Sequence, residues 1–282
     1  MTTANLDQTA HWNSEAGGGH WVAHQARHDR MLEPFLTMIR TEARIRPGER
    51  VLDVGCGCGA TTRAAAALAA PATVTGLDLS AAMLARASDD ARAARLANIS
   101  FIQGDAQVHS LDPACFDVVI SRFGLMFFDD PVAAFTNLRR ATRHGGRLVF
   151  VCWQPMAANQ WLLVPATALA EHVPQSAPLS PDAPGMYALA DPDRLRAILT
   201  DAGWSDVTVT PARTSMLVGG GGTVDEAVQW VRSGSMARSM LADADPLTEQ
   251  RALASVRSAL VPYADADGVR LDAAVWVVRA LA

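Results

Sequence analysis

Short apolar runs and helical stretches alternate along the middle of the chain. The apolar runs are rich in β-branched residues and predict buried strands, while the stretches between them repeat apolar positions at helical spacing. Strand–helix alternation of this kind predicts a doubly wound parallel sheet with right-handed crossovers. The predicted strands are residues 51–54, 73–77, 99–102, 116–120 and 148–152, and the predicted helices are 60–69, 81–96 and 132–142.

Side chains that favour helix ends mark the limits of these predicted helices. Ser80 and Asp130 are residue types that cap helix N-termini, and Pro131 suits the first helical position. The His-Gly-Gly sequence at 144–146 predicts the end of the fourth helix and the turn into the fifth strand. The capping signals and the apolar pattern therefore agree.

Residues 1–45 precede this alternation, are predicted to be helical and are rich in tryptophan and histidine. Apolar residues recur near helical spacing from residue 20 onward, and Pro34 predicts a kink in this run. We expect the segment either to pack on the main domain as an amphipathic helix or to form a lid over a cofactor. In the second case Trp12 and Trp21 would be its walls.

The second half of the chain carries two insertions. A proline-rich stretch at 155–190 surrounds one short helical piece at 159–171 and is not typical of a core element. Four glycines at 219–222 predict a flexible joint into further helices. The remaining predicted elements are a helix from 191 to about 200, a strand at 207–214, helices at 224–241 and 246–260, and a strand at 268–280.

These elements predict an α/β fold with a mostly parallel seven-stranded sheet whose last strand is antiparallel. The chain divides into a helical segment, 1–45, and a main domain, 46–282. Insertions at 155–190 and 219–262 are expected to form a cap over a substrate, with Trp161 and Trp230 giving it apolar surface.

Composition narrows the function classes. The chain has 282 residues, of which 50% are hydrophobic and 19% charged, so we expect a globular protein. The net charge of −5 and the absence of a basic run argue against a nucleic-acid substrate. No secretory leader and no apolar run of membrane-spanning length are recognisable, and the four cysteines suit a reducing environment, so we expect a cytoplasmic enzyme without membrane attachment.

The stretch from Arg50 to Thr62 joins a predicted strand to a predicted helix through alternating glycines. Such a turn lets the backbone and the N–H groups of a helix N-terminus approach a ligand closely. Gly55-x-Gly57-x-x-Ala60 also satisfies the pattern of a dinucleotide-binding loop. The loop therefore predicts a nucleotide-type cofactor without deciding which one.

Three acids at the ends of successive predicted strands bear on whether the loop binds a dinucleotide or a cofactor that carries a positive charge. Asp53 lies just before Gly55, where a cationic ligand has a use for a carboxylate and a pyrophosphate has none. Asp78 suits the hydroxyls of a ribose, which both classes contain. Asp105 can accept a hydrogen bond from an exocyclic amine such as that of adenine.

The ordered set of motifs resembles the class I (Rossmann-like) S-adenosylmethionine-dependent methyltransferases. The resemblance is strong over about residues 48–152 and rests on layout elsewhere. It is carried by Val51-Leu-Asp-Val-Gly-Cys-Gly-Cys-Gly59, Asp78, Gly104-Asp105-Ala106, Phe116-Asp-Val-Val-Ile-Ser-Arg122 and Arg139-Arg140 through Gly145-Gly146-Arg147-Leu148-Val149.

The resemblance implies S-adenosylmethionine as cofactor, S-adenosylhomocysteine as product, and a role for each motif residue. Glycines 55, 57 and 59 would let the cofactor approach the backbone, and Asp78 would bind its ribose. The residues that would contact the cofactor are Asp53, Gly55, Gly57, Gly59, Asp78, Leu79, Met83, Asp105, Ala106, Ser121, Arg122 and Phe123. Leu79 and Met83 would flank the adenine, Asp105 and Ala106 would fix its amino edge, and the last three would line the sulfonium side.

Several of these residues have a structural alternative. Met83 could be a core residue, Arg122 could pair with a carboxylate, and Asp53 could cap backbone amides. Asp129 and Asp130 could suggest magnesium, but Pro131 favours a helix cap, and Cys56-x-Cys58 has no partner pair for zinc, so no metal is expected.

Methyl transfer from a sulfonium requires alignment of the acceptor atom, the methyl carbon and the sulfur, and a base only for some acceptors. His20, His24 and His28 could supply a base, but the sequence assigns none. We expect a small-molecule acceptor, such as a secondary metabolite or a quinone-like compound, methylated on O, N or C by a monomer or homodimer. A peptide methyltransferase and an NAD-dependent oxidoreductase remain as alternatives.

Overall fold

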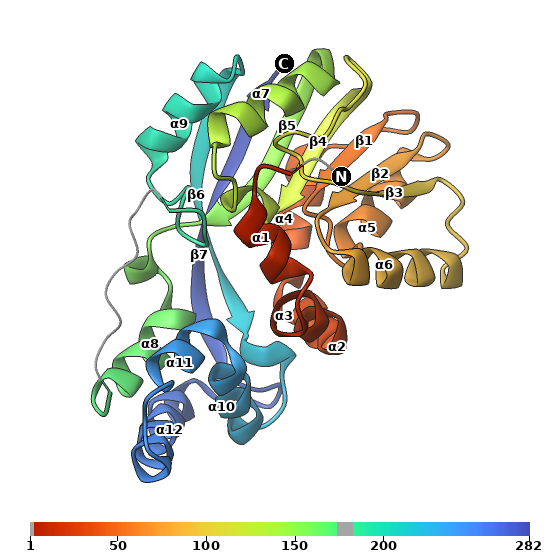
Figure 1. Ribbon diagram of the computed structural model, residues 1–282. Helices are drawn as coiled ribbons and strands as arrows, with labels where there is room; N and C mark the ends of the chain where they lie inside the picture. The colour runs from red at the N-terminus through yellow and green to blue at the C-terminus, as the bar shows by residue number, and fades with distance from the viewer. Residues whose placement is uncertain (1–2, 174–182) are drawn as a thin grey trace.

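The computed structural model describes residues 3–173 and 183–282, and part of the predicted insertion, 174–182, lies outside the described residues. In the described parts, seven strands form one sheet in the order β3-β2-β1-β4-β5-β7-β6 (Figure 1). The strands are β1 (Val51–Val54), β2 (Val74–Asp78), β3 (Ile99–Gln103), β4 (Phe116–Arg122), β5 (Thr142–Trp153), β6 (Ser205–Leu217) and β7 (Arg270–Leu281).

Pairing directions confirm the predicted fold class. The first five strands pair in parallel, and β7 lies antiparallel between β5 and β6. Helices connect β1 to β2, β2 to β3 and β4 to β5, as is usual between parallel strands, whereas a loop over residues 104–115 joins β3 to β4. The helices of this part are α4 (Glu33–Ala43), α5 (Ala60–Ala69), α6 (Ala81–Ala93), α7 (Pro131–Ala141) and α9 (Pro192–Asp201).

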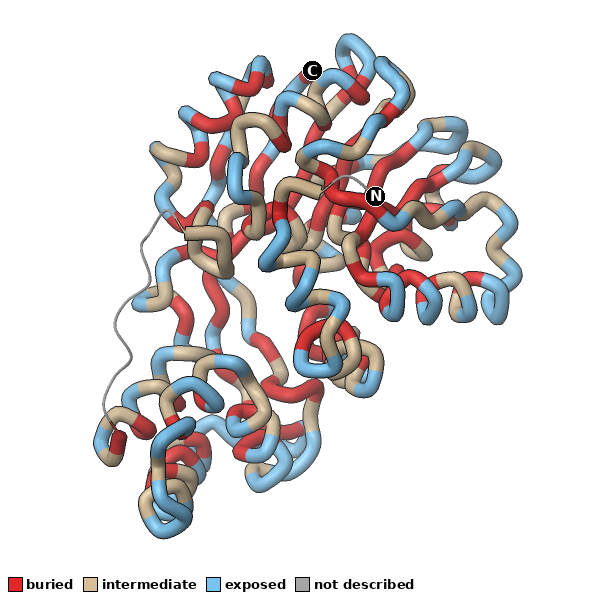
Figure 2. Tube along the Cα trace, viewed as in Figure 1, coloured by how far each residue is buried: buried red, intermediate tan, exposed pale blue. Residues whose placement is uncertain are grey.

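The core lies along the central strands. All four residues of β1 are buried, and Figure 2 shows burial following the strands through the sheet. Helix α4 packs on β4 and β5, while α7 packs on β5 and on α9, which in turn packs on β6. Phe35, Phe135 and Phe150 are among the fully buried side chains, so large apolar residues from helices and sheet meet in one core.

A second apolar cluster joins the two insertions. Helices α8 (Gln160–Ala170), α10 (Val224–Ser233), α11 (Ser235–Met240) and α12 (Pro246–Leu260) pack together at one end of the long strands β6 and β7 (Figure 1). Leu169 and Val256 are fully buried in this cluster. We call these four helices the cap helices.

The N-terminal segment is a chain of short helices that precedes α4. Its elements are α1 (Leu6–Trp12), a π-helical turn (Glu15–Gly19), α2 (His20–Ala23) and α3 (Gln25–Met31). None of the helices among residues 3–173 and 183–282 is long and apolar enough to cross a membrane.

Three local predictions were wrong. Pro34 does not kink a continuous helix; the break falls at Leu32, and Pro34 lies in the first turn of α4, where its missing N–H is not needed. The helix predicted over 132–142 corresponds to α7, but β5 begins directly at Thr142 rather than at residue 148, so residues 144–146 lie within the strand, where its pairing to β4 is irregular. The helix predicted at 224–241 is divided at Gly234 into α10 and α11.

Asn159 ties the cap helices to the sheet and provides a test of the fold. Its fully buried amide donates to the carbonyl oxygens of Gln154 and Pro155 and accepts from the Ala274 N–H and the Trp161 indole. Replacing Asn159 by alanine leaves buried groups unpaired, at ~1–3 kcal/mol each. We expect Asn159→Ala to lower the free energy of unfolding by about 2–4 kcal/mol in urea titrations. Gln250→Ala, which removes an exposed amide on α12, is the control and should change it little.

Candidate functional site

The glycine loop between β1 and α5 adopts left-handed backbone conformations, with φ values of 65° at Gly55 and 55° at Gly57. A Cβ at Gly55 would lie 2.6 Å from Cα of Gly124, so the loop is in close backbone contact with the end of β4. A Cβ at Gly57 would instead find only Met83 Sδ at 3.9 Å and Trp21 Nε1 at 4.0 Å. One side of Gly57 is therefore open to a ligand.

Asp78, at the end of β2, holds this loop. Its Oδ2 accepts from the Gly57 N–H and its Oδ1 from the Ser80 N–H, both at 2.8 Å. Burial raises the pKa of Asp78, and these backbone hydrogen bonds act in the opposite direction. The carboxylate thus fixes the loop that would cradle a cofactor, and its contact with a ribose remains a prediction.

Asp53 is fully buried and only partly satisfied. Thr62 Oγ1 donates to its Oδ2 at 2.7 Å, whereas Oδ1 has no hydrogen-bond partner in the described part of the chain. Burial raises the pKa of Asp53 to about 7, while the Thr62 hydrogen bond and, to a smaller extent, Arg122 act in the opposite direction. Because one oxygen of Asp53 is left unpaired by the described residues, a cationic group nearby would stabilise its ionised form.

Asp105, just after the end of β3, anchors the N-terminal segment by accepting its hydrogen bonds. Its Oδ2 accepts from Thr3 Oγ1 and from the N–H groups of Ala4 and Asn5, and its Oδ1 from Asn5 Nδ2 and the Gln107 N–H. Hydrogen bonds, led by that of the Asn5 N–H, hold the pKa of Asp105 below its usual range against the opposing effect of burial. A hydrogen bond from adenine to Asp105 would have to share this carboxylate with the segment.

Two asparagines of the N-terminal segment were missed by sequence reasoning. Asn5 is buried, and besides its contact with Asp105 its Oδ1 accepts from the Asp129 N–H. Asn13 donates to the Leu79 carbonyl at 3.0 Å and accepts from the Ala81 N–H at 3.1 Å. These partners are more than sixty residues away along the chain, and no local pattern indicates them.

The residues at the end of β4 have different roles. Ser121 donates to the Val54 carbonyl at 2.7 Å and accepts from the Gly124 N–H, which makes it a tie between β4 and β1. Arg122 is largely buried; it donates to the Leu32 carbonyl at 3.3 Å, and its Nη2 lies 3.9 Å from Asp29. Phe123 stacks on Trp153 with ring centroids 4.2 Å apart and contacts Phe35 edge-on. Phe35, Phe123 and Trp153 therefore form an aromatic wall at the end of β4, which is in contact with the glycine loop.

The other predicted positions lie around the same strand ends. Met83 is buried beside Gly57, and Leu79 contributes its carbonyl to Asn13 and Gln103. The Ala106 carbonyl accepts from Asn137. Asp130 caps α7 through the Ala133 N–H, as predicted. Among the described residues no cluster of three metal-ligating side chains occurs.

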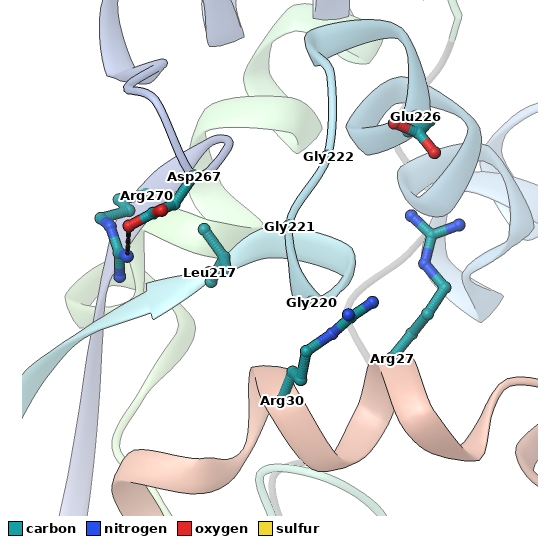
Figure 3. Close-up of a pocket in the computed structure, with 9 residues that line it drawn as sticks. All are labelled: Arg27, Arg30, Leu217, Gly220, Gly221, Gly222, Glu226, Asp267 and Arg270. Carbon is teal, nitrogen blue, oxygen red and sulfur yellow. Dashed lines mark hydrogen bonds and ion pairs between the residues drawn. The ribbon is translucent and has the colours of Figure 1, made fainter.

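A surface hollow of about 520 Å³ lies elsewhere, between α3 and the glycine turn that follows β6 (Figure 3). Its charged lining comprises Arg27 and Arg30 from α3, Glu226 from α10, and the ion-paired Asp267 and Arg270. None of the predicted cofactor residues lines it. The hollow is therefore distinct from the predicted cofactor site around Gly57, Asp53 and Asp78, which we call the cradle.

The cradle agrees with what comparison with known proteins shows. A family model described as a methyltransferase domain matches residues 52–150. The demethylmenaquinone methyltransferase of Renibacterium salmoninarum is 32% identical over 170 residues, which cover 57% of this chain and 69% of that protein. The chain belongs to the class I S-adenosylmethionine-dependent methyltransferases.

Other matches support the methyltransferase assignment and its fold. Aklanonic acid methyltransferase DauC of a Streptomyces species is 33% identical over 45% of this chain, and the match spans 61% of that relative, less than two thirds of its length. The structure of the YcgJ protein from Bacillus subtilis has a TM-score of 0.56 at 16% identity and covers 88% of this chain and 98% of that one. Membership of this family confirms the predicted cofactor, S-adenosylmethionine, and the dinucleotide alternative is not supported.

The buried carboxyl of Asp53 makes the methyltransferase's stability depend on pH. Its pKa in the folded state, about 7, exceeds the unfolded value of about 3.9. Folding therefore favours the protonated form, and the stability that this contributes is present at low pH and lost as pH rises from about 4 to 7. We expect Asp53→Asn to raise the unfolding free energy of the ligand-free protein at pH 8 by about 2–4 kcal/mol, and much less at pH 4.

The same substitution should weaken S-adenosylmethionine binding by calorimetry, because it removes the charge that a cationic ligand would meet. Asp243→Asn, at an exposed position, is the control for both measurements. A stability gain equal at pH 4 and pH 8, or unchanged cofactor affinity, would contradict this role of Asp53.

The anchoring of the N-terminal segment on Asp105 is tested through Asn5. Asn5→Ala removes the side-chain hydrogen bonds to Asp105 and Asp129 but leaves the Asp105 carboxylate in place. We expect faster amide hydrogen exchange in residues 3–13, by about tenfold for a loss of ~1.4 kcal/mol, with little change in the central strands. Gln8→Ala, which removes only a contact to Trp12 within α1, is the comparison. Unchanged exchange in Asn5→Ala would show that the anchor does not depend on this side chain.

Proposed function

We propose that this chain transfers the methyl group of S-adenosylmethionine to an O, N or C atom of a small-molecule acceptor by direct displacement. The observation that carries the proposal is the position of Trp21, whose indole nitrogen lies 4.0 Å from where a Cβ of Gly57 would be. The open side of the cradle is thus bounded by the N-terminal segment. A site bounded on this side by the N-terminal segment suits a small acceptor better than a folded protein.

The residues present fit the cofactor. The open side of Gly57 admits a ligand next to the backbone, the unpartnered Oδ1 of Asp53 offers an acceptor, and Asp78 lies beside both. We propose that Asp53, Gly55, Gly57 and Asp78 hold it in the cradle. Leu79, Met83, Ala106 and Asp105 would then bound its adenine, and Ser121, Arg122 and Phe123 its sulfonium side.

When bound, the cofactor supplies an electrophilic methyl group on a sulfonium. The protein's own contribution is to position the acceptor and to exclude water, and orientation of two reactants can provide ~7–11 kcal/mol of the barrier. The stacked pair Phe123 and Trp153, with Phe35 edge-on, forms a rigid apolar wall next to the end of β4. Trp161 extends this wall toward the cap helices, 5.0 Å from Trp153.

The acceptor class follows from this aromatic lining and from the relatives. Trp21, Trp161 and Trp230 come from the N-terminal segment and the cap helices and are only partly buried, so we propose that they offer apolar surface to a ring system. The relatives include enzymes named for aklanonic acid and for demethylmenaquinone. We therefore propose a secondary-metabolite or quinone-like acceptor, bound between the N-terminal segment and the cap helices.

Two measurements test the proposed function. S-adenosylhomocysteine at a hundred times its dissociation constant should stabilise the protein by ~2.7 kcal/mol, visible as a rise in melting temperature, whereas NADH should cause none. With methyl-labelled S-adenosylmethionine, label should enter organic-solvent extracts of small molecules rather than peptides. A flat melt with S-adenosylhomocysteine, or label found only in peptides, would contradict the proposal.

A further inference from the structure

A group of basic and aromatic side chains lies between the N-terminal segment and the cap. His20 begins α2, His24 lies between α2 and α3, and His28 lies in α3; the rings of His20 and His24 stack with centroids 4.3 Å apart. His28 stacks on Trp21, with ring centroids 3.8 Å apart and planes 5° apart, and meets Trp230 of α10 edge-on at 4.8 Å. We call these five side chains the histidine cluster.

His28 is buried without hydrogen-bond partners. His28 is only 7% exposed, and neither of its ring nitrogens has a hydrogen-bond partner among the described residues. His24 Nδ1 is likewise buried and unpaired. An unpaired buried polar group costs ~1–3 kcal/mol, so such groups in a native structure call for a partner that the protein itself does not supply.

The charges that act on the histidine cluster are mainly positive. Burial lowers the pKa of His28 to about 3, and the next causes are His20, His24, Arg122 and Arg27. Arg238 from α11 acts in the same direction on His20. The acid next to His28 in sequence, Asp29, lies 3.9 Å from both Arg63 and Arg122 and is engaged with them.

The histidine cluster adjoins the cofactor cradle. Trp21, on which His28 stacks, is the side chain whose indole nitrogen borders Gly57. Arg122 is close enough to both regions for its positive charge to lower the pKa of His28 and that of Asp53. A molecule that meets the nitrogens of His28 therefore lies close to the cradle, where the acceptor has to be.

We propose that the acceptor is an anionic aromatic molecule and that His28 orients its acidic oxygen toward the cofactor. This inference rests on the proposed function, since it assigns the acceptor of the same site. The ring N–H of a neutral His28 donates to a carboxylate or enolate oxygen, while Arg27 and Arg122 supply the countercharge. His28 is thus a positioning residue for an acid acceptor.

An anionic acceptor needs no catalytic base, and no base is assigned to this site. The acceptor's oxygen forms a bond to the methyl carbon as the carbon–sulfur bond breaks, and the bonding pair of electrons stays on sulfur. No proton has to leave, because the oxygen is already ionised. A histidine with a pKa near 3 is a weak base, and orienting a preformed anion does not require it to accept a proton.

Matched pairs of probes test this inference by calorimetry on protein loaded with S-adenosylhomocysteine. The probes are benzoate, 2-naphthoate and anthraquinone-2-carboxylate, each compared with its primary amide. We expect at least one acid to bind ten times more tightly than its amide. His28→Phe, which keeps a ring against Trp21, should reduce this preference to less than threefold, and His28→Gln, which keeps an N–H donor, should retain part of it.

Controls separate positioning from a structural effect. His28→Phe should bind S-adenosylhomocysteine within twofold of the wild type and should raise KM for the preferred acid while lowering kcat. His11→Phe, at an exposed position of α1, should keep the tenfold preference. Equal binding of acids and amides, binding of neither, or an undiminished preference in His28→Phe would overturn the inference. A wild-type protein that does not bind S-adenosylhomocysteine would instead contradict the proposed function.

Discussion

Three carboxylates buried at the ends of adjacent parallel strands constrain everything around the cradle. A buried carboxylate is costly unless donors reach it. Asp78 is satisfied by the N–H groups of Gly57 and Ser80, which fixes the glycine loop, and Asp105 by the start of the chain, which fixes the N-terminal segment. Asp53 receives one hydroxyl and keeps one oxygen unpaired. Folding thus satisfies two of these acids and leaves one oxygen of the third unpaired.

The same anchoring couples the cofactor cradle to the cap helices. The N-terminal segment is held at one end by Asp105 and Leu79, and at the other by Arg27, which donates to the Gly219 carbonyl at 2.7 Å and lies over Trp230. A displacement of this segment would therefore open the cradle and loosen the contact with α10 together. Cofactor exchange and acceptor exchange are expected to share one motion for that reason.

The sequence predicted the sheet and most helices because buried strands and capped helices have local signals. Asp130 with Pro131 is one example, since both residues act within the first turn of α7. Proline led to a wrong prediction at position 34. A proline that kinks a helix and a proline in the first turn of a new helix look alike in sequence, because they differ only in whether the residues before them continue a helix. The cradle glycines were found by motif, but Asn5 and Asn13 were not, because their roles come from contacts with distant strand ends.

The two incompletely satisfied regions of the site have opposite requirements. Asp53 keeps one buried oxygen unpaired, where the proposed sulfonium would be favourable, and Arg27, Arg122 and Arg238 act on the histidine cluster, where the proposed anion would be favourable. A sulfonium and an anionic oxygen both lose their charge when the methyl group is transferred. In an enclosed site of low dielectric constant their attraction is strong before the reaction, so the walls must hold them in line rather than merely together. The stacks of Phe123 on Trp153 and of His28 on Trp21 are the walls that we expect to provide that restraint.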